Sequence, residues 1–337
     1  MKAIAMTAPG GAEVLQQVEL EQPQIAAPTE VLVRVQAAGI NPVDTKIRSR
    51  GPMREATGPT VLGCDGAGVV EAVGAEVTLV APGDRVWYCS GGLGGERGNY
   101  AEFNVVDEAL LQPVPAGLDI DQAAAAPLVL ITAWEALHDR AGIKPGQQVL
   151  IHAGAGGVGH VAIQLAVAAG ARVATTVSSA EKAEFVHQLG AECAINYREE
   201  SVVEAIADWT QGRGVDIALD TVGPEVFRQT IPAMALYGDL VTILDPSSNA
   251  GDVLDLGEAR LRNLRISLEL MLTPQLRDIR EAQVHQGWIL RQCAELITQG
   301  RLRIEVSGRY PLAQAADAHR RLEAGGLTGK LVLRIDG

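Results

Sequence analysis

Apolar and polar residues alternate with two different periods along this chain. Up to about residue 124, short alternating runs such as residues 30–36 and 68–73 are separated by Gly and Pro turns, which predicts a mainly antiparallel β domain. From residue 125 to residue 263, apolar runs alternate with amphipathic helical segments, a pattern typical of a doubly wound parallel sheet. The runs expected to form its strands are residues 149–153, 172–177, 193–196, 215–220 and 239–244.

The last part of the chain mixes both patterns. It predicts a strand-like run at 264–272, a helix through 288–298, a strand at 303–306, a helix near 313–322 and a closing strand at 331–335. We expect the closing strands to rejoin the first domain. The predicted fold class is therefore α/β, with a discontinuous mainly-β domain (1–124 and 264–337) and a parallel-sheet domain (125–263). An exposed apolar edge is a liability in a monomer, so the run at 264–272 predicts a homodimer.

The most informative motif lies between the first predicted strand of the parallel sheet and the helix that follows it. Gly154, Gly156 and Gly159 have the G-x-G-x-x-G spacing, with Gly157 and Val158 inside it. Such glycines allow a tight turn, a close approach of the backbone to a pyrophosphate and a close helix–strand contact. The free N–H groups at the start of the helix favour the phosphates. A Gly-rich turn without a ligand is the alternative, and the position between strand and helix favours the dinucleotide.

The end of the second predicted strand indicates which dinucleotide binds. An NAD site usually places Asp or Glu here for the ribose hydroxyls, whereas this chain has Ser178 and Ser179, with Lys182 just beyond. Hydroxyls and an ammonium favour a 2′-phosphate, which an acidic side chain would repel. Tyr197 and Arg198 follow the next strand and are within reach of the same phosphate. The alternative is that the two cations are solvated surface charges. We predict NADPH as the cofactor.

The length and composition of the chain are those expected of a soluble enzyme. The 337 residues suffice for two domains, and no apolar run has the length of a membrane span. The formal charge of −13 argues against nucleic acid or an anionic membrane as a partner. The start of the chain lacks a signal-peptide pattern, and the four cysteines are scattered, so we expect a cytoplasmic protein without disulfides.

The chain resembles the zinc-independent quinone oxidoreductases, the zeta-crystallin-like branch of the medium-chain dehydrogenase/reductase superfamily. The resemblance covers essentially the whole chain and is carried by residues 38–49, 63–70, 82–86, 99–103, 153–159, 195–200 and 328–332. It implies a GroES-like catalytic domain built from both chain ends, with a Rossmann nucleotide-binding domain between them. It also implies NADPH-dependent reduction of quinones or α,β-unsaturated carbonyls, usually by homodimers or tetramers.

The zinc ligands of related alcohol dehydrogenases are missing from this sequence. Where the family pattern has its first ligand, a Cys, this chain has Asn41, and where it has a Gly-His-Glu element, this chain has Gly63, Cys64 and Asp65. The four closely spaced Cys of a structural zinc site are replaced by a Gly-rich segment at 90–99. Cys64 could still ligate a metal, but a buried thiol packed as a small apolar side chain is favoured. We predict no metal.

Two residues are the candidate catalytic groups. By resemblance, Asn41 faces the nicotinamide, where its amide could donate to the substrate oxygen or contact the cofactor. The alternative, equally weighted, is an Asn that caps the turn before Pro42. Lys46 stands where many quinone reductases of this branch have Tyr, and its ammonium could stabilise a developing enolate. An exposed, ion-paired Lys46 is the commoner alternative.

Further cofactor contacts are expected at the carboxyl ends of later strands, from Thr221, Val222, Gly223 and Leu244. By resemblance, Thr132 lies near the nicotinamide, and Lys330 returns to the same region. The alternative for Lys330 is a surface Lys before the last strand.

Three hypotheses on function follow. The leading one is a metal-free, NADPH-dependent reductase of quinones or α,β-unsaturated carbonyls, because hydride delivery to an electrophilic carbon needs only hydrogen-bond donors near the carbonyl oxygen. The second is an alcohol dehydrogenase, and the third is a catalytically silent NADPH-binding protein, since no acid/base group stands out.

Overall fold

The computed structural model describes residues 1–56, 58–247 and 254–335, and the chain divides into two compact units. Unit 1 comprises Met1–Leu128 and Leu272–Gly337, and unit 2 comprises Val129–Met271. The first boundary falls inside helix α3 (Pro127–Trp134) rather than at 124/125. The second falls at 271/272 rather than 263/264, because strand β14 (Arg265–Leu268) pairs with strand β13 (Met234–Thr242) of unit 2.

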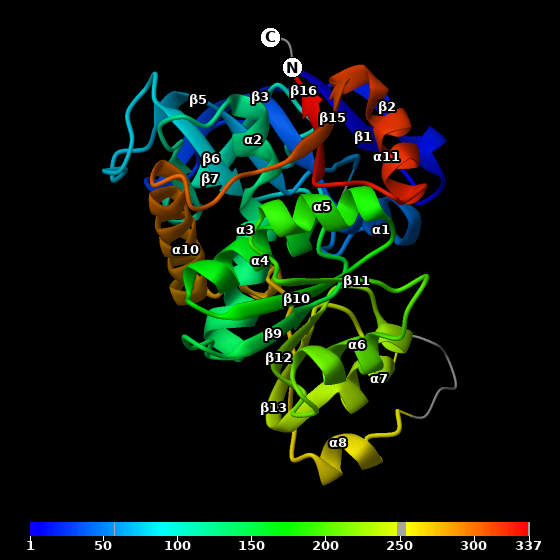
Figure 1. Cartoon of the computed structure of the whole chain (residues 1–337). Helices are drawn as coiled ribbons and strands as arrows, with labels where there is room; N and C mark the ends of the chain where they lie inside the picture. The colour runs from blue at the N-terminus through cyan, green and yellow to red at the C-terminus, as the bar shows by residue number, and fades with distance from the viewer. Residues whose placement is uncertain (57, 248–253, 336–337) are drawn as a thin grey trace. The chain divides into compact units, whose positions relative to one another are not determined.

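Unit 2 contains a six-stranded parallel sheet with the order β11-β10-β9-β12-β13-β14 (Figure 1). This is the 3-2-1-4-5-6 order of the Rossmann fold, with the reversal of strand order between β9 and β12, so the predicted doubly wound sheet is confirmed. Its other elements are the π-helix η3 (Glu135–Arg140), β9 (Gln148–Ile151), α4 (Gly157–Ala168), β10 (Arg172–Val177), α5 (Ala180–Gln188), β11 (Cys193–Asn196), α6 (Val202–Trp209), β12 (Val215–Asp220), α7 (Pro224–Thr230), η4 (Ile231–Ala233) and α8 (Gly257–Leu261).

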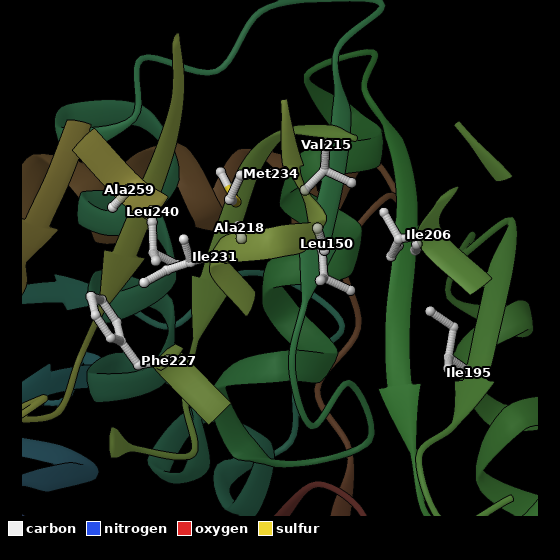
Figure 2. Close-up of a cluster of buried hydrophobic side chains, with 12 residues drawn as sticks. Leu150, Ile195, Ile206, Val215, Ala218, Phe227, Ile231, Met234, Leu240 and Ala259 are labelled. Carbon is white, nitrogen blue, oxygen red and sulfur yellow. The ribbon is translucent and has the colours of Figure 1, made fainter. Parts of the chain in front are cut away.

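One face of this sheet is covered by a cluster of buried apolar side chains (Figure 2). The strands contribute residues such as Leu150, Ile195 and Ala218, and α6 and α7 contribute Ile206 and Phe227. No member of the cluster comes from α4 or α5, which pack on β9, β10 and β11. Burial of these apolar surfaces fixes the sheet, and the sheet in turn places the loops at its carboxyl edge.

Two strands of this sheet have ends that the hydrophobic pattern misplaced. β9 ends at Ile151 instead of residue 153, because Ala153 has a φ of +52°, which turns the chain out of the sheet. β13 begins at Met234 instead of residue 239, and the pairing with β12 continues past Tyr237, which has a φ of +62°. Local backbone conformations of this kind leave no periodic signal in the sequence.

Unit 1 is mainly β. A seven-stranded sheet has the order β15-β16-β3-β5-β6-β8, with β7 also paired to β3, and a small sheet has the order β2-β1-β4. The strands are β1 (Lys2–Met6), β2 (Gln16–Glu19), β3 (Glu30–Ile40), β4 (Thr60–Val61), β5 (Asp65–Val73), β6 (Arg85–Cys89), β7 (Phe103–Asp107), β8 (Leu111–Pro113), β15 (Val306–Pro311) and β16 (Lys330–Arg334). The helices are η1 (Ala12–Val14), α1 (Pro42–Arg50), η2 (Glu108–Leu110), α2 (Ile120–Ala125), α9 (Thr273–Leu276), α10 (Arg280–Thr298), η5 (Leu312–Gln314) and α11 (Ala315–Glu323).

The C-terminal strands complete the sheet of unit 1. β16 pairs antiparallel with β3 and parallel with β15, so the closing strands rejoin the first domain as the pattern predicts. The strand predicted at 303–306 is wrong in position, because the ladder with β16 starts only at Val306 and runs to Pro311. Among the described residues, no helix is both long enough and apolar enough to cross a membrane.

Candidate functional site

The carboxyl edge of the parallel sheet in unit 2 carries the Gly-rich loop between β9 and α4. The N–H of Gly154 donates to the carbonyl of Thr176 at 3.0 Å, and the N–H of Ala153 donates to the Thr176 hydroxyl at 2.9 Å. These bonds attach the start of the loop to the end of β10. These hydrogen bonds therefore fix the backbone conformation at the start of the Gly-rich loop, the first of the predicted cofactor-binding segments.

Two of the three motif glycines are required by the packing of the protein itself. A Cβ on Gly154 would lie 2.0 Å from the Thr175 hydroxyl oxygen, and one on Gly159 would lie 2.3 Å from the carbonyl oxygen of Ala153. A Cβ on Gly156 would meet nothing closer than 3.2 Å. Gly156 is thus the position where the absence of a side chain leaves space for a ligand rather than for the protein.

Helix α4 begins at Gly157 without a side-chain cap. Gly157, Val158 and Gly159 are its first three residues, so their N–H groups have no acceptor within the helix. His160 is the first residue to donate back, to the carbonyl of Gly156 at 3.0 Å. Three free donors and the positive end of the helix dipole fit the pyrophosphate of a dinucleotide.

The residues predicted to select NADPH lie at the ends of β10 and β11. Ser179 caps α5, because its hydroxyl oxygen accepts the N–H of Lys182 at 3.3 Å. Ser178 and Lys182 are partly exposed. Tyr197 is 53% exposed, and its N–H donates to the carbonyl of Val177, so the ends of these two strands are adjacent. The two positions directly after β10 hold Ser178 and Ser179 instead of an acidic residue, and the first acidic side chain is Glu181 in the first turn of α5.

The loops after β12 and β13 form the other half of this edge. The buried carboxylate of Asp220 accepts the N–H groups of Val222 and Gly223 at 2.9 and 3.0 Å, and burial raises its pKa. The Thr221 hydroxyl donates to the carbonyl of His152 at 2.9 Å. A Cβ on Gly223 would lie 3.5 Å from the Leu244 side chain. The remaining residue predicted in this unit, Thr132, is buried in α3.

In unit 1, Asn41 lies in a buried polar cluster. Its Nδ2 donates to Asp65 at 2.9 Å, and its Oδ1 accepts from the ammonium of Lys330. Lys330 also donates to the carbonyl of Ile40 at 3.0 Å and lies 3.8 Å from Asp65. Lys330 is 4% exposed, so the alternative of a surface lysine is wrong. A contact of either residue with cofactor or substrate stays a prediction.

Asn41 also starts helix α1, which is the alternative that sequence reasoning left open for it. It precedes Pro42 in extended conformation, and its N–H donates to the carboxylate of Asp44 at 2.8 Å. Burial raises the pKa of Asp44 to about 7. The Tyr100 hydroxyl donates to the same carboxylate at 3.5 Å and lies 3.0 Å from Nε2 of His319.

Lys46, the second catalytic candidate, lies on α1 and is half-buried. Burial lowers its pKa, and the like charge of Arg50 lowers it further. Within the described residues Lys46 has no ion pair, whereas Arg48 on the same helix is paired with Glu323. The alternative of an exposed, ion-paired Lys46 therefore does not describe this structure, while its contact with substrate stays a prediction.

A zinc ion does not fit the positions that correspond to the missing ligands. The Asn41 oxygen contacts the Lys330 ammonium, so a metal ligated there would lie beside a fixed positive charge. Burial and the nearby Asp44 and Asp65 raise the pKa of the Cys64 thiol, which suits a thiol packed as a small apolar side chain. Across residues 1–56, 58–247 and 254–335, no group of three or more His, Cys, Asp or Glu side chains could hold a metal ion.

Comparison with known proteins identifies the family. Residues 27–116 match the model of the alcohol dehydrogenase GroES-like domain, and residues 189–333 match that of the zinc-binding dehydrogenases. A quinone oxidoreductase of Pseudomonas aeruginosa is 38% identical over 98% of this chain and 99% of its own length. The chain belongs to the quinone oxidoreductase family.

Other members of this family match over similar lengths. The crystal structure of Escherichia coli quinone oxidoreductase complexed with NADPH has a TM-score of 0.85 and 33% identity, and covers 99% of this chain and 100% of that one. A 2-haloacrylate reductase of a Burkholderia species is 33% identical over 91% of both chains. The family and the GroES-like and Rossmann folds inferred from the sequence motifs are confirmed.

Sequence reasoning missed several residues that shape these sites. His152 and Thr176 join the loops at the carboxyl edge of the parallel sheet, and His319 lies against Tyr100 in the buried cluster of unit 1. His152 stands directly before the Gly-rich motif, and this position was the one available signal. The contact between Tyr100 and His319 joins positions far apart in the chain, which no local pattern reveals.

Proposed function

We propose that this protein is an NADPH-dependent, zinc-independent reductase that transfers hydride to quinones or α,β-unsaturated carbonyls. The observation that carries the proposal is the uncapped start of α4 beside Gly156, where three backbone donors and an open approach suit a pyrophosphate. Kinship with quinone oxidoreductases and with a 2-haloacrylate reductase supports the two classes of acceptor.

In this proposal, different residues of unit 2 bind different parts of the cofactor. The N–H groups of Gly157, Val158 and Gly159 bind the pyrophosphate, while Ser178, Ser179, Lys182 and Tyr197 bind the 2′-phosphate. Contacts from Thr132, Leu244 and residues 221–223 complete this part of the site. When bound, NADPH supplies the hydride, which is delivered to the electrophilic carbon of the acceptor.

In unit 1, Lys46 is proposed to stabilise the negative charge that develops on the carbonyl oxygen of the acceptor. Its half-buried ammonium lacks an acidic partner among the described residues, so its charge is available to an anion. Asn41 is held between Lys330 and Asp65, and we assign it and Lys330 to the wall of the site. The proton that completes the reduction comes from water in this scheme.

We further propose a homodimer that joins through β14. This strand is the last of the six-stranded sheet; Leu268 at its end is 63% exposed, and Leu270, just after it, is 49% exposed. An apolar strand edge favours pairing with a second copy. A cytoplasmic location is proposed because the four cysteines are free thiols, which persist in a reducing compartment.

The decisive experiment follows the absorbance of NADPH with EDTA-treated protein and a panel of ortho-quinones, para-quinones and alkenals, with NADH as the control cofactor. We expect turnover with NADPH that EDTA does not reduce. Oxidation of alcohols that depends on added zinc would indicate a dehydrogenase instead. Saturable NADPH binding without turnover across the panel would indicate a binding protein and contradict the proposal.

Preference for NADPH is expected to depend on Lys182. In Lys182→Met, the Kd of NADPH should rise about tenfold, because a charge-assisted bond to the 2′-phosphate is lost. The Kd of NADH should stay unchanged, since NADH lacks this phosphate. The matched control is Lys144→Met, at an exposed lysine of the same unit. An equal rise in the Kd of NADPH and of NADH in Lys182→Met would show that this lysine does not bind the 2′-phosphate.

A further inference from the structure

His152 is a buried, titratable side chain that the proposed function does not use. It follows β9 directly, and only 3% of its surface is exposed. Its Nε2 lies 2.8 Å from the hydroxyl oxygen of Thr230 on α7, and its Nδ1 lies 3.4 Å from the hydroxyl oxygen of Thr176 on β10. The imidazole therefore connects β10, which pairs with β9 on one side, to α7, the helix that follows β12, the strand on the other side of β9.

The neighbouring hydrogen bonds fix the tautomer of this imidazole. The Thr230 hydroxyl donates its only hydrogen to the carbonyl of Val226 at 2.6 Å, so it must accept from His152. Nε2 therefore carries the hydrogen and Nδ1 is the acceptor. Thr176 accepts the N–H of Ala153 and has its own hydrogen left for Nδ1. Burial lowers the pKa of His152 to about 4, which keeps the ring neutral.

This chain of bonds holds a backbone segment that would otherwise relax. Ala153 has a φ of +52°, in the left-handed region that is unfavourable for a residue with a Cβ. Such a conformation persists only where the surroundings impose it. Here the N–H of Ala153 is bound by Thr176, and Thr176 is oriented by His152. The carbonyl of Ala153 in turn accepts the N–H of Gly156 at 2.9 Å.

The same residue also contacts the second cofactor segment. The carbonyl of His152 accepts the Thr221 hydroxyl at 2.9 Å, and its ring is bonded to α7, the helix that begins directly after Gly223. His152 is thus connected to the Gly-rich loop on one side and to residues 221–223 on the other. These are two of the segments that the proposed cofactor site places around NADPH.

We infer that His152 is a positioning residue for the cofactor, which holds the Gly-rich loop and the loop after β12 at the spacing that NADPH requires. The inference rests on the proposed cofactor site in unit 2. It assigns no chemical step to the imidazole. Its role is to fix the strained Ala153 and, through it, the free N–H groups at the start of α4.

The test compares His152→Phe, which keeps a ring but loses both hydrogen bonds, with His152→Asn, whose Oδ1 can replace the Nδ1 acceptor. For His152→Phe we expect the Kd of NADPH, measured by fluorescence titration, to rise at least about tenfold. The kcat at saturating NADPH and the KM of the acceptor should stay within about twofold. His152→Asn should recover much of the lost affinity. The control is His187→Phe, at an exposed histidine of α5. We expect this variant to bind NADPH with the affinity of the wild type.

A second variant keeps the inference testable where His152→Phe does not fold. Thr176→Val removes the hydroxyl between His152 and Ala153 with little change of shape. It should weaken the binding of NADPH about as much as His152→Phe does. His152→Phe combined with Thr176→Val should bind NADPH no more weakly than either single variant, because both substitutions break the same chain of hydrogen bonds. A lower Tm with unchanged NADPH affinity would overturn the inference. Titration needs no acceptor, so a failure of the proposed reductase activity is seen separately.

Discussion

Replacing Gly159 by alanine is expected to raise the Kd of NADPH by about 100-fold, or about 2.7 kcal/mol. The new Cβ would lie 2.3 Å from the carbonyl oxygen of Ala153 and 2.8 Å from the Cα of Gly154, both of which are backbone atoms that cannot rotate away. Helix α4 must therefore shift from the loop and carry its free N–H groups with it. Overpacking of this kind also lowers the free energy of unfolding by about 1–3 kcal/mol.

Gly156→Ala is the matched comparison within the same loop. Its φ is −78°, and its Cβ would meet only the carbonyl oxygen of Ala153 at 3.2 Å, so the fold should tolerate it. We expect Gly156→Ala to bind NADPH more weakly, with a nearly unchanged Tm, because the added methyl group would occupy space that the ligand needs. Titration with NADPH and thermal unfolding of both variants measure the two effects. Wild-type affinity in both would contradict the assignment of this loop to the cofactor.

Replacing Lys330 by methionine is expected to lower the free energy of unfolding by about 3–5 kcal/mol, the usual cost of leaving a buried charge without its partner. The ammonium contacts Asn41, donates to the carbonyl of Ile40 at 3.0 Å and lies 3.8 Å from the fully buried Asp65. Without it, Asp65 keeps only neutral partners, namely the amide of Asn41, the N–H of Leu128 and the Cys89 thiol. We expect activity to fall as well, because Asn41 loses its orientation.

The stability of Lys330→Met should also depend on pH more than that of the wild type. Burial raises the pKa of Asp65, and Lys330 opposes this rise. In the variant the pKa of Asp65 is higher still, so the folded state holds a proton that the unfolded chain releases above its ordinary pKa of about 4. By linkage, stability then falls as pH rises from about 4 to the folded pKa. The loss should be smaller at acidic than at alkaline pH.

Urea unfolding at several pH values measures this effect. Lys144→Met, at an exposed lysine, is the control and should unfold like the wild type. Asp65→Asn combined with Lys330→Met should regain part of the lost stability, since the buried negative charge is gone. A loss in Lys330→Met that is independent of pH would show that Asp65 does not carry it.

Much of the nucleotide-binding unit could be predicted from the sequence because its signals are local. Apolar runs located all five predicted strands of the parallel sheet, and glycine spacing located the turn before α4. The errors lie where a single backbone conformation decides, as at Ala153 and Tyr237, both of which have positive φ. Side-chain type does not indicate these conformations, because both are imposed by hydrogen bonds and pairing with other strands.

The candidate site in unit 1 was harder to predict because its contacts join distant parts of the chain. Asn41 and Lys330 are 289 positions apart, and Tyr100 and His319 are 219 apart. Sequence reasoning could name Asn41, Lys46 and Lys330 by resemblance, but it could not foresee that Lys330 would be bonded to Asn41. The environment of such residues follows from strand pairing over long separations, here β16 with β3.

The pairing of β16 with β3 also sets an order of events during synthesis. Unit 2 is one continuous stretch of chain, so all of its strands are synthesised before β15 and β16. Residues 37–40 of β3 stay unpaired on the edge away from β5 until residues 330–334 emerge and add beside them, whereas residues 30–34 of that edge pair with β7. The ammonium that neutralises Asp65 arrives in this same final strand. We therefore expect nascent chains to acquire the nucleotide-binding fold first and to complete the sheet of unit 1 only after residues 330–334 have emerged.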